Sequence, residues 1–329
     1  MQLHNPWIRS KKKFLGDSIE WFRVNRKSHR HKMNDIYQIA GITKQAHWKA
    51  RQKQQRDLEN ETMVLVDVRN LRDLHPRMGG KTLYDLIRPD SIGRDRFLAL
   101  LAEEGLQLAR RRNSARTTWS VKSWRYANLL EGIVLTGVDQ VWVTDITYFF
   151  IGEDCYYIVL VMDLYSRRVL GYSVESHMRT ESCLAALEMA FTTRGKRNFG
   201  GTLIHHSDRG SQYASDRYTG MLENSGIRIS MCLVVYENSH AERLNGTIKN
   251  DYLEPKSPKN LKDLKRMLGE TVRLYNEKRP HESLGKLPPV QYEEMIKSQP
   301  REKRLEMRPF VHPDTKVRNK LRNQMTIFD

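Results

Sequence analysis

The chain has 329 residues, 39% of them apolar, which is long enough for two or three domains and apolar enough to bury a sizeable core. Its 56 Lys and Arg outnumber its 39 Asp and Glu, giving a formal net charge of +17. The apolar content excludes a disordered basic protein, and the lack of a long apolar run excludes a membrane-spanning one. With no signal-peptide core and three cysteines outside any metal-ligand spacing, the sequence predicts a soluble, cytoplasmic protein.

The positive charge is concentrated toward the two ends of the chain. Residues 1–60 hold 14 Lys or Arg against 5 Asp or Glu, and residues 296–329 hold 9 against 4. Residues 139–295 hold 20 against 21. Because Lys and Arg neutralise phosphates, the ends are predicted to hold a polyanion while the near-neutral middle carries out chemistry.

Residues 1–32 are basic and rich in aromatic residues but show no convincing periodicity. They indicate a phosphate-binding arm, although a plain solvated tail explains them equally well. Residues 33–60 then predict a helix-turn-helix, with a short helix, a turn around Gly41 and a second helix from Lys44 that has Thr43 as its N-cap. Alone this pattern is weak, and the basic second helix favours it.

Residues 61–115 predict a second helical DNA-binding module. Apolar residues recur at helical spacing up to Leu74, where a His-Pro pair stops the run. Two further helices are expected at 81–88 and 94–104. A purely structural bundle is the alternative. Residues 116–138 carry few periodic signals and are predicted to form a linker.

Residues 139–295 predict an α/β domain with a mixed sheet and flanking helices, because three strands in succession are followed by alternating helices and strands. A helix bearing Glu242 follows the last strand, and a long amphipathic helix capped by Asn260 closes the domain. Residues 296–329 are predicted to be a basic tail. The expected strands are 141–149, 156–163, 168–174, 202–207 and 227–231, and the expected helices between them are 180–191 and 216–224.

Three acidic residues carry the chemistry that we expect of this domain. Asp145 interrupts an apolar strand, Asp208 stands where a strand breaks into a turn, and Glu242 lies on a helix. Each alone has an ordinary explanation as an edge, turn or surface residue. Together, carboxylates from two strand ends and a helix can hold two hard divalent cations, which activate an attacking oxygen and stabilise a leaving oxygen at phosphorus.

Lys249 is the fourth candidate. In an α-helix seven residues turn through about 700°, within about 20° of two full turns, so Lys249 is expected on the same face as Glu242. A solvated surface lysine is the alternative reading.

Five segments in this order resemble the orfB-type transposases of the IS-three insertion-sequence family and, more distantly, retroviral integrases. The resemblance covers roughly residues 33–295. The matching segments are Trp142-Val143-Thr144-Asp145-Ile146-Thr147-Tyr148, Asp163-Leu164-Tyr165-Ser166-Arg167, His206-Ser207-Asp208-Arg209-Gly210-Ser211-Gln212-Tyr213, Asn238 through Lys249, and Tyr275-Asn276-Glu277-Lys278-Arg279-Pro280-His281-Glu282-Ser283-Leu284-Gly285.

This resemblance implies a ribonuclease-H-like catalytic core in which Asp145, Asp208 and Glu242 hold two Mg²⁺ ions, with Mn²⁺ as a substitute, and Lys249 is the basic residue that follows the glutamate. It implies nicking at the ends of an insertion sequence and strand transfer by a 3′ hydroxyl. It also implies end binding by the helical modules, a homo-oligomer on DNA, a possible companion orfA-type protein and a bacterial, nucleoid-associated location.

The chain departs from the family before the glutamate. Only 33 residues separate Asp208 from Glu242, about two fewer than usual, and the family's basic turn is replaced by an apolar segment. We expect Cys232–Tyr236 to be a packed apolar connector that lowers turnover, with Asn238 or Ser239 capping the next helix. Two alternatives remain open: a catalytically silent DNA-binding regulator derived from such a transposase, and a ribonuclease-H-like nuclease that stops at hydrolysis.

Overall fold

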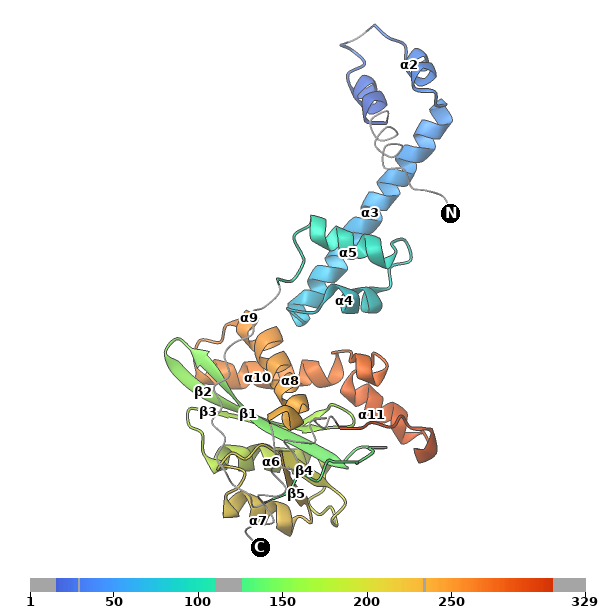
Figure 1. Ribbon diagram of the computed structural model, residues 1–329. Coiled ribbons are helices and arrows are strands. Elements are labelled where there is room, and N and C mark those ends of the chain that lie inside the picture. Colours follow the sequence, from blue (N-terminus) through green and yellow to red (C-terminus); the bar gives the residue numbers. More distant parts are fainter. Residues whose placement is uncertain (1–15, 29, 110–125, 233–234, 310–329) are drawn as a thin grey trace. The chain divides into compact units, whose positions relative to one another are not determined.

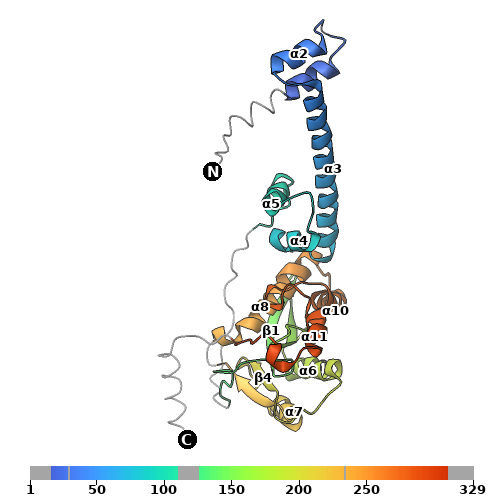
Figure 2. The same ribbon diagram turned by 90° about the vertical axis from the view of Figure 1, so that its right-hand side faces the viewer.

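The computed structural model describes residues 16–28, 30–109, 126–232 and 235–309, without the side chains of 235 and 236, and divides into two compact units (Figures 1 and 2). Unit 1 comprises residues 1–70 and 83–107, and unit 2 comprises residues 71–82 and 108–329. In the part of the chain that is described, no helix is long and apolar enough to cross a membrane.

Unit 1 is helical. Residues 16–24 form a helix that buries Ile19, so the expectation of an arm without regular structure is wrong for this stretch. The more strongly basic residues 1–15 lie outside the described residues. Three helices of the predicted modules follow as α2 (Met33–Ala40), α4 (Gly80–Ile87) and α5 (Arg94–Glu103).

Helix α3 runs without a break from Lys44 to Leu74. The predicted boundary at residues 60 and 61 is therefore not an interruption of the backbone. The reason is that residues 44–74 contain neither Gly nor Pro and are rich in Gln, Glu, Lys and Arg, which are good helix formers. The helix ends where the His-Pro pair was expected to stop it.

The turn between α2 and α3 forms as predicted. Gly41 adopts the left-handed conformation, with φ of 66°, and its N–H donates back to the Gln38 carbonyl. Such a residue ends a helix at no steric cost only when it lacks a Cβ atom. Thr43 Oγ1 accepts a hydrogen bond from the Ala46 N–H at 3.0 Å, the N-cap contact expected at the start of α3.

Unit 2 is built on the mixed five-stranded sheet that the sequence predicts, in the order β3-β2-β1-β4-β5. The first three strands form an antiparallel meander, and β4 and β5 run parallel to β1. Strand β1 therefore lies at the centre of the sheet. The strands are β1 (Val141–Ile151), β2 (Asp154–Asp163), β3 (Val169–Glu175), β4 (Ile204–Ser207) and β5 (Arg228–Met231).

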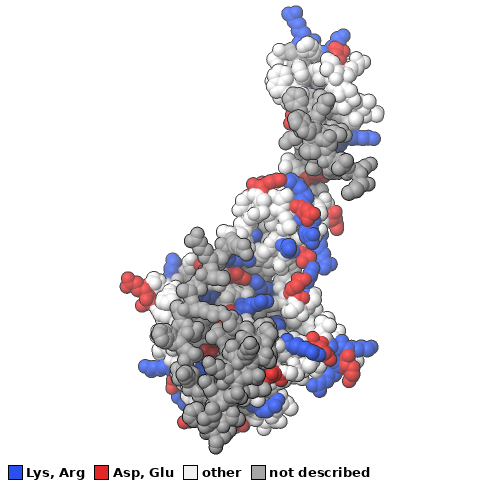
Figure 3. Space-filling model, in the orientation of Figure 1, with Lys and Arg blue, Asp and Glu red and all other residues white. Residues whose placement is uncertain are grey.

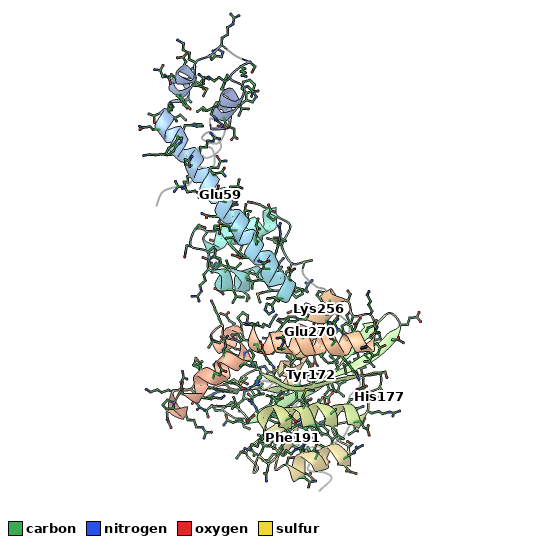
Figure 4. All side chains as sticks on the ribbon, turned by 180° about the vertical axis from the view of Figure 1, so that it is seen from behind. Glu59, Tyr172, His177, Phe191, Lys256 and Glu270 are labelled. Atoms are coloured by element: carbon green, nitrogen blue, oxygen red, sulfur yellow. The ribbon has the colours of Figure 1, made fainter. Side chains whose placement is uncertain are left out.

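Helices cover both faces of this sheet (Figures 1 and 2). On one face, α6 (Thr180–Arg194) and α7 (Asp216–Asn224) bury a core that includes Phe191. On the other, α8 (Ser239–Gly246), α10 (Leu261–Glu277) and α11 (Pro289–Lys297) bury a second core, against which Tyr172 of β3 packs (Figure 4). Asn260 caps α10 as predicted, since its Oδ1 accepts from the Asp263 N–H at 3.0 Å.

Two segments that were predicted to be loosely attached pack on the core. Residues 126–138 of the expected linker bury Leu130 and Leu135, and Leu135 forms a two-way backbone bridge with Met307. Residues 296–309 of the expected tail thus complete the core instead of extending from it. Both predictions missed this because short irregular segments show no periodicity. Residues 116–125 and 310–329 lie outside the described residues.

A buried ion network joins the strand ends of unit 2 to its helices. Asp163, at the end of β2, is inaccessible to solvent, and its Oδ1 accepts from the Ser166 N–H at 2.8 Å. Arg194 of α6 lies between Asp139, at 2.7 Å, and Glu293 of α11, to which it donates twice at 2.8 Å. Burial raises the pKa of Asp163 to about 6. For Glu293 burial is the largest single cause, but the charge and hydrogen bonds of Arg194, together with hydrogen bonds from Ser166 and Arg168, outweigh it and lower the pKa.

Replacing Glu293 by Gln keeps the shape of the side chain but leaves Arg194 and Arg168 without their shared carboxylate, which Arg168 contacts at 2.7 Å. We expect the free energy of unfolding to fall by about 3 kcal/mol, because the buried Arg194 loses two charge-assisted hydrogen bonds and Arg168 loses its carboxylate, while Asp139 and Asp163 stay beside Arg194 and compensate only in part. Urea titration would measure this loss. The control is Glu188→Gln, which removes a solvent-exposed pair with Arg197 and should change stability little. Equal midpoints for the two variants would contradict this role for Glu293.

Candidate active site

Two of the predicted acidic residues come from adjacent parallel strands and lie close enough to interact. Asp145 is the fifth residue of β1, and Asp208 directly follows β4. The last pair of the register is Val143 with His206, Asp145 and Asp208 each lie two residues further along, and the Asp208 carboxylate raises the pKa of Asp145. Because side chains alternate between faces along a strand, both carboxyl groups point to the same side of the sheet.

Glu242 comes from the helix that packs across this side. It lies in the first turn of α8, which packs against β1. Its side chain is exposed, whereas Ala241 and Leu244 beside it are buried in the core. The structure therefore brings Asp145 and Asp208 together at the centre of the sheet and places Glu242 above β1 on a separate element.

The electrostatics of this group are those of crowded negative charges. Burial, the Asp208 carboxylate and, more weakly, the Glu242 carboxylate together raise the pKa of Asp145 to about 8. Burial also raises the pKa of Asp208, although the Gly210 N–H donates to its Oδ1 at 3.0 Å. Like charges removed from water disfavour ionisation unless a cation neutralises them.

Two asparagines tie α8 to β1: Asn245, which the sequence did not single out, and Asn238, which was expected in another role. Asn245 Nδ2 donates to Asp145 Oδ2 at 2.9 Å and so orients that carboxylate. Asn238 was predicted to cap α8, but its side chain makes no cap and instead donates to the Thr144 carbonyl at 3.0 Å. The two lie seven residues apart, nearly two helical turns, with Glu242 between them, and this spacing is the signal that could have identified them.

The donor set fits a hard divalent cation. Its ligands would be carboxylate oxygens, which Mg²⁺ prefers, and the raised pKa of Asp145 marks a place where added positive charge is favourable. Within the described residues, no three His, Cys, Asp or Glu side chains converge closely enough to hold one ion. Of the three predicted carboxylate ligands, Asp145 and Asp208 thus lie near each other, and Glu242 does not converge with them.

The helix that carries Lys249 is not the continuous α-helix on which it was expected to share a face with Glu242. Helix α8 ends at Gly246 and a π-helical segment, η2 (Thr247–Leu253), follows it, so the shared face stays a prediction. The wider π turn shifts later residues around the axis. A hollow of about 480 Å³ beside Glu242 is lined by side chains of α8 and by Asn250 and Asp251, and Lys249 is not among its lining residues.

The apolar connector before α8 is described only at its ends. Cys232 is buried, as expected, and Glu237 and Asn238 at the other end are buried as well. Between them, residues 233 and 234 and the side chains of 235 and 236 lie outside what the structure describes, so the packing predicted for the middle of Cys232–Tyr236 stays a prediction.

Comparisons with known proteins agree with this architecture. Two sequence profiles, both described as "Integrase core domain", match residues 136–234 and 229–289. The chain is 35% identical over 208 residues to the "Insertion element IS600 uncharacterized 31 kDa protein" of Shigella sonnei, a match that covers 62% of this chain and 75% of that protein.

A second relative is "Transposase InsF for insertion sequence IS3A" of Escherichia coli, 32% identical over 171 residues and 50% of this chain. The chain spans 58% of the length of that relative and of the mycobacterial insertion-sequence transposases that it also matches. Among solved structures, the HTLV-2 integrase catalytic core domain aligns with a TM-score of 0.40 at 19% identity, covering 48% of this chain and 97% of that one.

Replacing Asp145 by Asn should stabilise the protein when divalent cations are absent. With a pKa of about 8 in the folded state and near 4 when unfolded, the carboxyl group binds its proton more tightly in the folded protein. The free energy of unfolding of the wild type therefore falls as pH rises from about 4 to about 8.

At pH 8 the Asp145→Asn variant should exceed the wild type by at least about 1.4 kcal/mol, the equivalent of one pKa unit, and the difference should shrink toward pH 5. Urea titrations in EDTA at the two pH values would measure it. Asp154→Asn, at the exposed start of β2, is the control and should show no such pH-dependent gain. A variant that is less stable than the wild type at pH 8 would contradict the crowded-charge account.

Proposed function

Because the chain belongs to the IS-three family of insertion-sequence transposases, we propose that it is a DNA transposase that nicks the ends of its element and joins a freed 3′ hydroxyl to a phosphodiester. The observation that carries this proposal is that Asp145 of β1 and Asp208, which directly follows the neighbouring strand β4, lie close enough for burial and the Asp208 charge to raise the pKa of Asp145 to about 8. Such a pair is poorly suited to a purely structural role and well suited to binding cations.

Asp145, Asp208 and Glu242 are the residues proposed to hold two Mg²⁺ ions, for which Mn²⁺ can substitute. Bound cations would supply the positive charge that favours an attacking oxygen and a leaving oxygen at phosphorus. Glu242 completes the set by a change of side-chain rotamer, since it does not converge with the two aspartates as it stands. Asn245 holds the Asp145 carboxylate in a fixed orientation through its 2.9 Å hydrogen bond.

The remaining parts of the proposal concern DNA and partners. Of the net charge of +17, most lies in the N-terminal part of the chain, and Lys and Arg appear on the visible face of unit 1 among Asp and Glu side chains (Figure 3). We assign terminal-repeat binding to the helical modules and phosphate contact to Lys249. A homo-oligomer is expected because two ends must be joined, and a companion orfA-type protein is a further candidate partner.

The test is to incubate the purified protein with labelled terminal-repeat DNA and Mg²⁺ and to resolve nicked and strand-transfer products. Both products are expected. Nicks without transfer would favour a nuclease. A folded protein that binds the ends and makes neither product would favour the silent-regulator alternative, which the altered segment before α8 suggests.

Single substitutions of the three carboxylates should abolish cleavage and preserve DNA binding. Asp145→Asn, Asp208→Asn and Glu242→Gln each keep the shape of the side chain and remove a charged ligand. The control is Asp216→Asn, a first-turn residue of α7 on the opposite face of the sheet, which should cleave normally. Product formation and filter binding on the same samples would check this, and retained cleavage in one variant would remove that residue from the site.

The reaction should depend on a small, hard cation. Mg²⁺ and Mn²⁺ are expected to support cleavage because they accept compact octahedral oxygen sites, whereas Ca²⁺ prefers larger, looser ones and should permit binding without turnover. Cleavage assays in EDTA, with each ion added back, would measure the dependence. Full activity in EDTA contradicts the cation site.

A further inference from the structure

The turn between β2 and β3 contains an arginine in a conformation that its side chain disfavours. Arg167 has φ of 62°, in the left-handed region where a Cβ atom is unfavourable and glycine is not. Its neighbours are fixed: Ser166 donates to Asp163 and to Glu293, and the Asp163 N–H donates to the Arg168 carbonyl. The backbone of Arg167 is therefore held rigidly in place, although glycine would adopt this conformation with less strain.

The Arg167 side chain reaches from this turn to α8. One of its terminal nitrogens, Nη1, lies 2.8 Å from His240 Nδ1. A guanidinium group can only donate, so His240 Nδ1 accepts and the ring hydrogen is on Nε2. Among the carboxylates that the structure describes, none forms an ion pair with Arg167, which lies partly buried between strand and helix. Its defined partner is thus a ring on α8, two residues before Glu242.

This contact is one of three side-chain hydrogen bonds that join α8 and the residue before it to the sheet in the described part of the chain, beside the core packing of Ala241 and Leu244. Asn238 holds the residue before the helix to the Thr144 carbonyl, and Asn245 holds its last turn to Asp145. Between them, the contact with His240 is made by Arg167 of the β2–β3 turn and not by β1. The exposed Glu242 side chain is not positioned by packing in the core, so its place relative to Asp145 follows from the placement of α8.

We propose that Arg167 is a positioning residue, which sets α8 through His240 and thereby places Glu242 relative to Asp145. This inference rests on the proposed function for its catalytic meaning, but the mechanical part concerns α8 alone. Because hydrogen bonds to Asp163 and Glu293 hold the β2–β3 turn, and Arg167 reaches from it to His240, the turn supports α8.

The test uses the full-length protein and the variant Arg167→Gly. Glycine suits φ of 62°, so the substitution removes the guanidinium group without straining the turn. Hydrogen exchange of the amides of residues 241–246 should become faster, because α8 loses one of its attachments and opens locally. The Mg²⁺ concentration that gives half-maximal cleavage should rise about 10-fold, as when an outer partner of a metal ligand is removed, with KM for DNA unchanged.

The matched control is Arg168→Gly, which removes the adjacent arginine of the same turn. Arg168 contacts Glu293 and, among the residues that the structure describes, forms no hydrogen bond or ion pair with α8, so exchange of 241–246 should stay at the wild-type rate even if the protein as a whole is less stable. Arg167→Lys, which keeps a cationic donor, should restore part of the wild-type Mg²⁺ dependence.

His240→Ala tests the same contact from the helix and serves if Arg167→Gly does not fold. The double variant should exchange no faster than the faster single variant, because both remove one contact. Unchanged exchange of 241–246 in folded Arg167→Gly or His240→Ala overturns the proposal. Hydrogen exchange needs no catalysis, so a wild-type protein that fails to cleave DNA would refute the proposed function and leave this test intact.

Discussion

A carboxylate on the central strand of a sheet is the constraint from which the rest of the site follows. Asp145 lies on β1 between β2 and β4, and Asp208 directly follows β4. Two half-buried acids close to each other resist ionisation, and the raised pKa of Asp145 expresses this. Hydrophobic packing gains nothing from such a pair, which is why the pair supports the proposal of a bound cation.

The surrounding structure supplies what that pair lacks. Asn245 orients one carboxylate, and the Asn238 amide and the Arg167 guanidinium hold the helix that carries Glu242. Farther out, Asp163 and its partners keep the β2–β3 turn rigid. The segment around Asn276 acts similarly on the edge strand, since its amide both donates to and accepts from the backbone of Val169. Motifs that look like a catalytic signature in sequence thus include several purely positioning residues.

Much of this arrangement could be predicted from sequence because the first three strands of unit 2 are rich in β-branched and aromatic residues, with Gly152 in the turn after the first and Ser166 in the turn after the second. The bounds of α7 were predicted to the residue, and the ends of β1 to β5 to within a few residues. Four features were not predicted: the helix at residues 16–24, the unbroken α3, and the packed segments 126–138 and 296–309. These features depend either on local helix propensity without a clear apolar period or on long-range contacts. Neither produces a periodic pattern of apolar residues in the sequence.

The candidate site shows the same division. The three acidic residues were found because together, in their local contexts, they match a metal-binding set. Arg167 and Asn245 act through partners 73 and 100 residues away, and for Asn245 the only local signal is its seven-residue spacing from Asn238. Lys249 was placed by an ideal helix that the π-helical segment η2 does not follow. Sequence spacing over more than one turn therefore assigns two residues to the same helix face only when the helix keeps regular α-helical geometry between them.

The central claim is that Asp145 and Asp208 form a cation site that Glu242 completes. Crystals grown with Mn²⁺ and measured at its absorption edge would test this most directly, because anomalous scattering locates the ion without reference to activity. The account predicts a peak within about 2.0–2.3 Å of carboxylate oxygens of Asp145 and Asp208, with Glu242 turned toward it. A peak elsewhere, or none between the two aspartates at saturating Mn²⁺, would contradict it.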